Sequence, residues 1–87
     1  MNKIREEIDK IDKEILKLLE KRFDAVLDVS AKKEQQGLLV RDFEREQEVL
    51  KKIEKGTKNK YYQEYTKKIY EDIMKHSREM QEQHRKK

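Results

Sequence analysis

Two cations interrupt an apolar helical stripe near the N-terminus. The stripe advances in steps of three and four residues, the spacing of one helical face, through Ile4, Ile8, Ile11, Ile15 and Leu18. The same face continues through Arg22 and Lys33, with Val26 and Val29 between the two cations. Eleven residues make about three helical turns, so both cations project from one face at a separation of about 16 Å along the axis.

Polar residues interrupt the apolar faces of two later segments as well. They are Arg45 and Glu46 in the second segment, and Ser77 and Gln81 in the third. A buried polar group without a partner costs about 1–3 kcal/mol, and a charged group costs more, so several in one small core imply mutual pairing or a bound ligand. The inward-facing set has three cations (Arg22, Lys33 and Arg45) and one acid (Glu46), so it carries an excess of positive charge. The pattern therefore predicts a site for a small anion with more than one carboxylate or phosphate.

Simpler structural roles are open for the same residues. Arg22 and Lys33 can extend their charged ends past the edge of an apolar interface while their aliphatic stems pack. Ser77 can donate to the backbone carbonyl of Ile73, as serines inside helices commonly do. These alternatives predict a folded surface with no ligand.

The composition indicates one small all-α domain with a thin core. Of 87 residues, 48% are charged and 33% are hydrophobic, and a chain of this length buries little more than ~60% of its unfolded surface. Proline is absent and strand signals are lacking, so helical preference extends nearly throughout. With no Cys and only His76 and His84, we expect neither a metal nor a cofactor.

The charge pattern bears on partners and location. The net charge is +4, but acids and bases alternate along the chain, as on a solvated helical surface, so no nucleic-acid partner is predicted. The start "MNKIREEIDK" has no apolar signal stretch, and no run of apolar residues is long enough to cross a bilayer. We expect a cytoplasmic protein without a membrane partner.

Two glycines and two capping residues divide the chain. Gly37 and Gly56 stand where helices commonly end on a left-handed residue. Asp42 can cap the second helix, and Thr57 or Asn59 the third. The predicted helices, long, short and long, cover about 3–35, 42–55 and 59–84. The tail "QHRKK" is expected to fray and is given no function.

The first helix is too long and too apolar for a single chain to cover. Beside its first stripe it carries a second, formed by Leu16, Leu19, Phe23 and Leu27. A partner chain is the natural cover for so broad a surface. We therefore expect an intertwined helical homodimer.

Three stretches carry a family resemblance over nearly the whole chain. They are "IREEIDKIDKEILKLLEKR", "AKKEQQGLLVRDFERE" and "SREMQ". Together they resemble the all-helical class of chorismate mutases. That pattern has an early Arg-x-x-Ile-Asp-x-Ile-Asp, then Leu-Leu-x-x-Arg, a Lys eleven residues on, Asp-x-x-Arg-Glu, and Ser-x-x-x-Gln. Each element is short, but their order and spacing make the combination specific.

The resemblance implies an isomerase of aromatic amino-acid biosynthesis that converts chorismate to prephenate by a pericyclic (Claisen) rearrangement. It further implies that Arg22 and, from the other subunit, Arg5 hold the two substrate carboxylates. Lys33 and Gln81 would donate to the ether oxygen of the breaking bond. The reaction needs no metal, nucleophile or general base, in agreement with the composition.

The remaining implied roles concern the rest of the substrate. Glu46 and the Asp42 region would bind its hydroxyl, Ser77 would bind a carboxylate, and Arg45 would complete the charge network. Asp42 is equally suited to be an N-cap. Arg5 has a simpler alternative too, as a solvated partner of Asp9 one helical turn away.

Two other functions stay open on the sequence. One is an isochorismate pyruvate lyase of the same fold, which clamps the same groups. The other is a non-enzymatic basic helical dimer that binds acidic partners. The basic dimer predicts that the affinity for an acidic partner depends strongly on salt. It also predicts that truncating Lys33 alone does not weaken binding, because many surface cations would share it.

Overall fold

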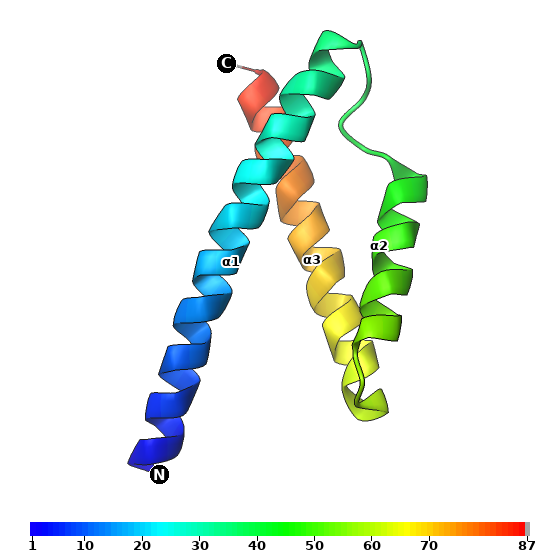
Figure 1. The fold of residues 1–87 in the computed structure, drawn as a ribbon. Helices are drawn as coiled ribbons and strands as arrows, with labels where there is room; N and C mark the ends of the chain where they lie inside the picture. The colour runs from blue at the N-terminus through cyan, green and yellow to red at the C-terminus, as the bar shows by residue number, and fades with distance from the viewer. Residues whose placement is uncertain (87) are drawn as a thin grey trace.

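The computed structural model describes residues 1–86 and is all-helical over that range (Figure 1). Its helices are α1 (Asn2–Gln35), α2 (Phe43–Gly56) and α3 (Lys60–Arg85). The predicted all-α class with a long, a short and a long helix is confirmed, and each observed bound lies within a residue or so of the expected one. None of these helices has an apolar stretch long enough to cross a membrane.

Side-chain caps begin the second and third helices. Asp42 Oδ1 accepts a hydrogen bond from the backbone N–H of Arg45 at 3.1 Å, and Asn59 Oδ1 accepts one from the N–H of Tyr61 at 2.9 Å. Each cap satisfies a backbone donor that the first turn of a helix leaves without a partner. The cap predicted for α2 is confirmed, and Asn59 rather than Thr57 caps α3.

The two glycines behave differently. Gly37 has φ +73°, the predicted left-handed conformation, and the N–H of Leu38 then reaches back to the carbonyl of Lys33 at 2.8 Å. The prediction for Gly56 is wrong: Gly56 has no positive φ and is the last residue of α2. The physical reason lies in Thr57, whose backbone N–H and hydroxyl both donate to the carbonyl of Ile53, at 3.0 and 2.7 Å. The end of α2 therefore needs no left-handed residue.

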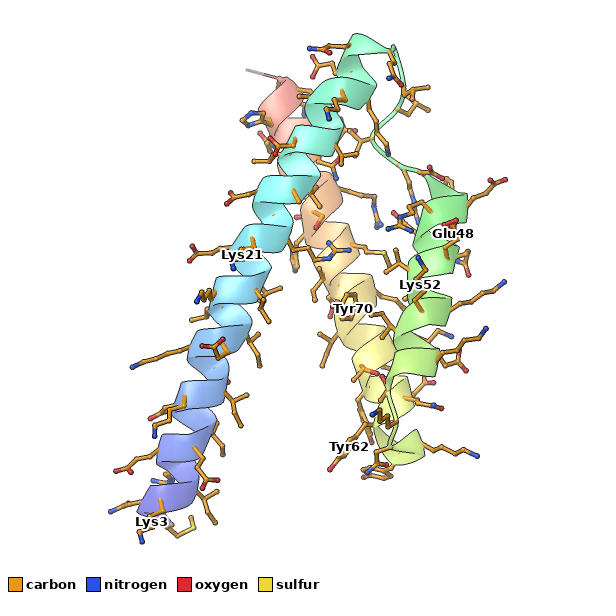
Figure 2. All side chains as sticks on the ribbon, viewed as in Figure 1. Lys3, Lys21, Glu48, Lys52, Tyr62 and Tyr70 are labelled. Atoms are coloured by element: carbon orange, nitrogen blue, oxygen red, sulfur yellow. The ribbon has the colours of Figure 1, made fainter. Side chains whose placement is uncertain are left out.

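Helix α3 lies against both other helices, and the N-terminal half of α1 extends away from them (Figure 1). The chain is elongated, with extents of 51 × 27 × 15 Å. Its buried hydrophobic residues are Val40 and Met74, 5% and 7% exposed, so the predicted thin core is observed. The apolar side chains left exposed along α1 include Ile4, Ile8, Ile11, Ile15, Leu16 and Leu18. Figure 2 shows that no other helix lies against the N-terminal end of α1, near Lys3. Within one chain, the first stripe of α1 therefore stays uncovered, whereas Leu19, Phe23 and Leu27 of the second stripe are partly buried.

Arg85 connects the C-terminal end of α3 to the end of α1, which corrects the expectation that the tail frays over residues 83–85, since these are helical; Lys87 lies outside the described residues. The Arg85 guanidinium donates to the carbonyls of Leu38 at 2.9 Å and Ser30 at 3.4 Å. Its Nε lies 3.7 Å from Glu34 Oε2, and the side chain is only 18% exposed. Arg85 therefore fixes the start of the loop that leads to α2.

Removing this tie should destabilise the fold. We expect Arg85→Met to lower the free energy of unfolding by about 1–3 kcal/mol, because charge-assisted hydrogen bonds to two carbonyls are lost. Urea unfolding at one fixed protein concentration measures the change. Lys86→Met, which removes the same charge from an exposed neighbour, is the matched control. Equal stability of the two variants would show that Arg85 contributes no more than surface charge.

Candidate active site

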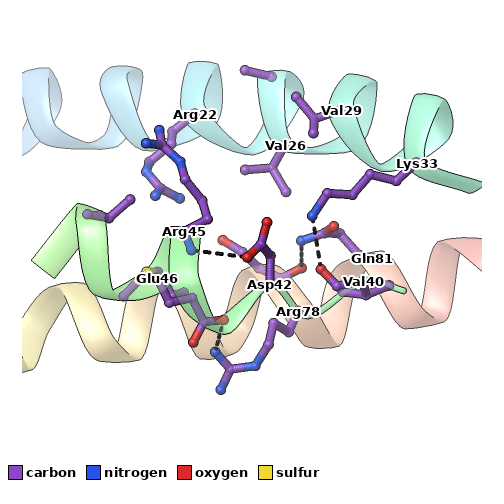
Figure 3. Close-up of a pocket in the computed structure, with 14 residues that line it drawn as sticks. Arg22, Val26, Val29, Lys33, Val40, Asp42, Arg45, Glu46, Arg78 and Gln81 are labelled. Atoms are coloured by element: carbon purple, nitrogen blue, oxygen red, sulfur yellow. Dashed lines mark hydrogen bonds and ion pairs between the residues drawn. The ribbon is translucent and has the colours of Figure 1, made fainter. Parts of the chain in front are cut away.

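The three helices enclose a partly open pocket of about 310 Å³ (Figure 3). Every predicted site residue except Arg5 lines it: Arg22, Lys33, Asp42, Arg45, Glu46, Ser77 and Gln81. Its apolar lining includes Val26, Val29, Val40, Val49 and Met74. Segments up to fifty-nine residues apart in sequence thus supply one small cavity, with polar groups set among valines.

Helix α1 contributes two cations to the same wall. Arg22 and Lys33 face the pocket with Val26 and Val29 between them, as the eleven-residue spacing predicts (Figure 3). Lys33 Nζ donates to the carbonyl of Val40 at 3.3 Å. An ammonium has three N–H donors, so this bond leaves others for a ligand. The Arg22 guanidinium carbon lies 5.8 Å from the centre of the Tyr70 ring, within the range of a cation–π contact.

Helix α3 contributes two buried polar side chains. Ser77 is 4% exposed and Gln81 is 8% exposed. The Ser77 hydroxyl donates to the carbonyl of Ile73 at 2.7 Å, the simpler role that the sequence left open. Gln81 Nε2 donates to the carbonyl of Ser77 at 3.1 Å. A side-chain amide carries two N–H groups, so Gln81 keeps one for a group in the pocket.

The acid Glu46 is paired with arginines that the sequence analysis did not select. Its Oε2 lies 2.7 Å from Nη1 of Arg78, and its Oε1 lies 3.4 Å from Nη2 of Arg41. Arg45, which the resemblance placed in the charge network, lines the pocket and also pairs with Glu48 at 3.4 Å. A signal for Arg78 was present in the sequence, because it follows the apolar Met74 by four residues and precedes Gln81 by three. Both steps keep a residue near one helical face.

Arg5 lies outside the pocket. It is exposed in the first turns of α1, and seventeen residues of helix place it about 25 Å along the axis from Arg22. The ion pair with Asp9 that offered a simpler role is not observed among residues 1–86. Within the described part of one chain, Arg5 has no contact with the residues of the site.

The charges of the lining favour an anionic ligand. The lining includes the cations Arg22, Lys33, Arg45 and Arg78 and the acids Asp42 and Glu46, and four minus two leaves +2. A small molecule with two negative charges and an apolar body matches both this balance and the valine walls. Among residues 1–86, no cluster of three or more His, Asp or Glu side chains is arranged to hold a metal ion.

Comparisons with known proteins agree with this chemistry. The sequence pattern of the family described as chorismate mutase type II matches residues 4–82. A curated chorismate mutase of Methanocaldococcus jannaschii is 35% identical over 82 residues, which cover 93% of this chain and 83% of that relative. No solved structure gives a significant match.

Proposed function

Since the chain belongs to the chorismate mutase type II family and is an intramolecular isomerase of that kind, we propose that the pocket between its helices converts chorismate to prephenate by clamping two carboxylates and stabilising the ether oxygen. One observation supports this site above the others. Polar residues from all three helices converge on a single cavity with an excess of two positive charges. The substrate is a dicarboxylate with an apolar ring, which fits that excess.

The rearrangement breaks one carbon–oxygen bond while it forms one carbon–carbon bond within the same molecule. Holding both carboxylates selects the compact conformer in which the reacting carbons approach. Donors fixed on the ether oxygen stabilise the negative charge that develops there. Lys33 Nζ and Gln81 Nε2 are suited to this role, because each retains a free N–H while its present hydrogen bond holds it in place.

The other polar residues are assigned to the rest of the substrate. Asp42 and Glu46 accept from the substrate hydroxyl, since a carboxylate can accept several hydrogen bonds and keep its present partners. Arg45 adds positive charge near Asp42. Ser77 can donate to a carboxylate only after its hydroxyl leaves the carbonyl of Ile73, so we assign it a smaller contribution.

We further propose that a second copy of the chain completes the site. The exposed isoleucines of α1 form a surface that an intertwined homodimer would bury. In an antiparallel arrangement of two α1 helices, Arg5 of one chain can reach Arg22 of the other. The distance of about 25 Å within a chain rules out a clamp on one small molecule by a single chain's Arg5 and Arg22.

Subunit mixing tests this arrangement. We expect Arg5→Ala and Arg22→Ala each to lower kcat/KM by about 10–100-fold, the loss of one charge-assisted hydrogen bond. When the two variants are unfolded together and refolded, half of the dimers are mixed, and each mixed dimer has one site with both arginines. Activity should then recover to about a quarter of wild type.

Separately refolded variants, combined only in the assay, are the control for subunit mixing. They should show no recovery as long as their dimers do not exchange subunits. Co-refolded mixtures that stay at the activity of either parent would show that Arg5 and Arg22 do not serve one site from two chains.

The direct test of the function follows chorismate and its product by NMR on addition of purified protein. Prephenate should form without a metal or cofactor in the buffer. No conversion of chorismate, with pyruvate released from isochorismate instead, would assign the site to the related lyase. No turnover of either substrate by a folded protein would overturn the proposed activity.

A further inference from the structure

Arg78 makes the shortest ion pair of the pocket. Its Nη1 lies 2.7 Å from Glu46 Oε2, and the two side chains are only 24% and 16% exposed. Figure 3 shows Arg78 on the side of Glu46 that faces away from Arg22 and Lys33. Arg78 is therefore placed behind the carboxylate, and the carboxylate lies between it and the cations of α1.

This placement matters because Glu46 is a negative charge in a pocket for a dianion. A charge-assisted hydrogen bond restricts the orientation of the carboxylate and offsets its charge. Arg41 supplies a weaker balance, since its Nη2 is 3.4 Å from Oε1 and its side chain is 46% exposed, where solvent screens the interaction. Without Arg78, the Glu46 carboxylate would be held by the more exposed Arg41 alone, and more of its negative charge would repel the substrate carboxylates.

We propose that Arg78 is a positioning residue of the reaction, which holds Glu46 toward the substrate hydroxyl and keeps the pocket attractive to a dianion. The proposal rests on the proposed function, because it takes Glu46 as the group that meets the hydroxyl. In this role Arg78 acts through Glu46 rather than on the reacting atoms. It also links α2 to α3 across thirty-two residues of sequence, so the same pair orients the helix that Asp42 caps and that carries Arg45.

A double-mutant cycle separates this role from others. We expect Arg78→Met to raise KM for chorismate by about tenfold, with a smaller change in kcat. Arg78→Lys should restore most of the loss, because it keeps the charge next to Glu46. In the Glu46→Gln background, where no carboxylate needs balancing, Arg78→Met should change KM by less than about threefold.

The matched control is Lys75→Met. Lys75 is an exposed cation one turn before Arg78 on α3 and does not line the site pocket. Its replacement removes the same net charge, so it measures the effect of general electrostatic attraction. We expect a change in KM below about twofold.

Three results would overturn the inference. An equal rise in KM with and without the Glu46 carboxylate would show that Arg78 does not act through Glu46. An equal rise in KM for Lys75→Met would show that KM depends only on the net charge of the protein. A lower urea midpoint with unchanged KM would make Arg78 a structural tie alone.

Failure of the underlying site is distinguished by Lys33→Ala. If Lys33→Ala retains full turnover, the pocket is not the site, and the role of Arg78 falls with it. If Lys33→Ala abolishes turnover while the cycle shows no coupling between Arg78 and Glu46, only the inference about Arg78 fails.

Discussion

Replacing Lys33 with alanine should lower kcat by about 10²–10³-fold, the largest effect that we expect from any truncation in this chain. The ammonium lies on the face of α1 that lines the pocket, tethered to the carbonyl of Val40 at 3.3 Å. A donor held in this way needs no reorganisation when charge develops on the ether oxygen, and such donors contribute about 2.7–4 kcal/mol to transition-state stabilisation. Formation of prephenate at saturating chorismate measures the loss.

Two controls separate the donor from its structural tether. Lys32→Ala removes the neighbouring cation, which is exposed and does not line the pocket, and should leave kcat within about twofold of wild type. Arg85→Met loosens the same loop through Leu38 and keeps Lys33. If Arg85→Met and Lys33→Ala lost activity equally, the loop rather than the ammonium would carry the effect. Full turnover by Lys33→Ala would remove Lys33 from the chemistry.

Helical periodicity located most of the site without any knowledge of the fold. Because a helix repeats every 3.6 residues, spacing alone placed Arg22 and Lys33 on one face and showed that Ser77 and Gln81 continue an apolar face. All four line the pocket. A polar residue on an otherwise apolar face is informative, because burying it without a hydrogen-bond partner is unfavourable and a partner or ligand is therefore expected.

Helical periodicity did not identify the ion-pair partner of Glu46. Arg45 is adjacent to Glu46 in sequence, but neighbours along a helix point to different faces, and the ion pair of Arg45 is with Glu48. The close partner, Arg78, is brought in by the packing of α2 against α3. Which side chains meet across two helices depends on their crossing and offset, and the periodicity of each helix alone does not fix these quantities.

The end of α2 and the position of Arg5 show two other limits. The glycine rule failed at Gly56 because the Thr57 hydroxyl supplied the hydrogen bond that a left-handed residue would otherwise help to form. For Arg5 the limit is one of assembly. If Arg5 acts in the site of a second chain, no contact within its own chain can reveal that role. The role is supported by the sequence resemblance and by the exposed apolar stripe of α1.

Gln81 gives the second large effect, because Gln81→Glu changes what the side chain can donate while it keeps the shape. The amide donates at every pH, whereas a carboxyl group donates only when it is protonated. We therefore expect Gln81→Glu to be active in acid and to lose activity about tenfold per pH unit above the pKa of the new carboxyl group. At neutral pH the loss should reach about 10²-fold or more.

The pKa that governs this loss reflects two opposing influences at the site. An exposed glutamate has a pKa of about 4.3, and burial at a position that is 8% exposed raises this pKa. Lys33, which lines the same pocket, favours the charged form and lowers it. The pH at which activity falls therefore reports the balance of burial and charge at the proposed ether-oxygen site.

The measurement is kcat/KM between about pH 4 and pH 8 for wild type, Gln81→Glu and Gln83→Glu. Gln83 is exposed two residues further along α3 and lies outside the site pocket, so Gln83→Glu adds the same charge without altering a donor. We expect its profile to follow that of wild type. If Gln81→Glu also follows wild type, a protonated side chain at this position is not needed. Gln81 would then have no part in stabilising the ether oxygen, and Lys33 would have to supply that stabilisation alone.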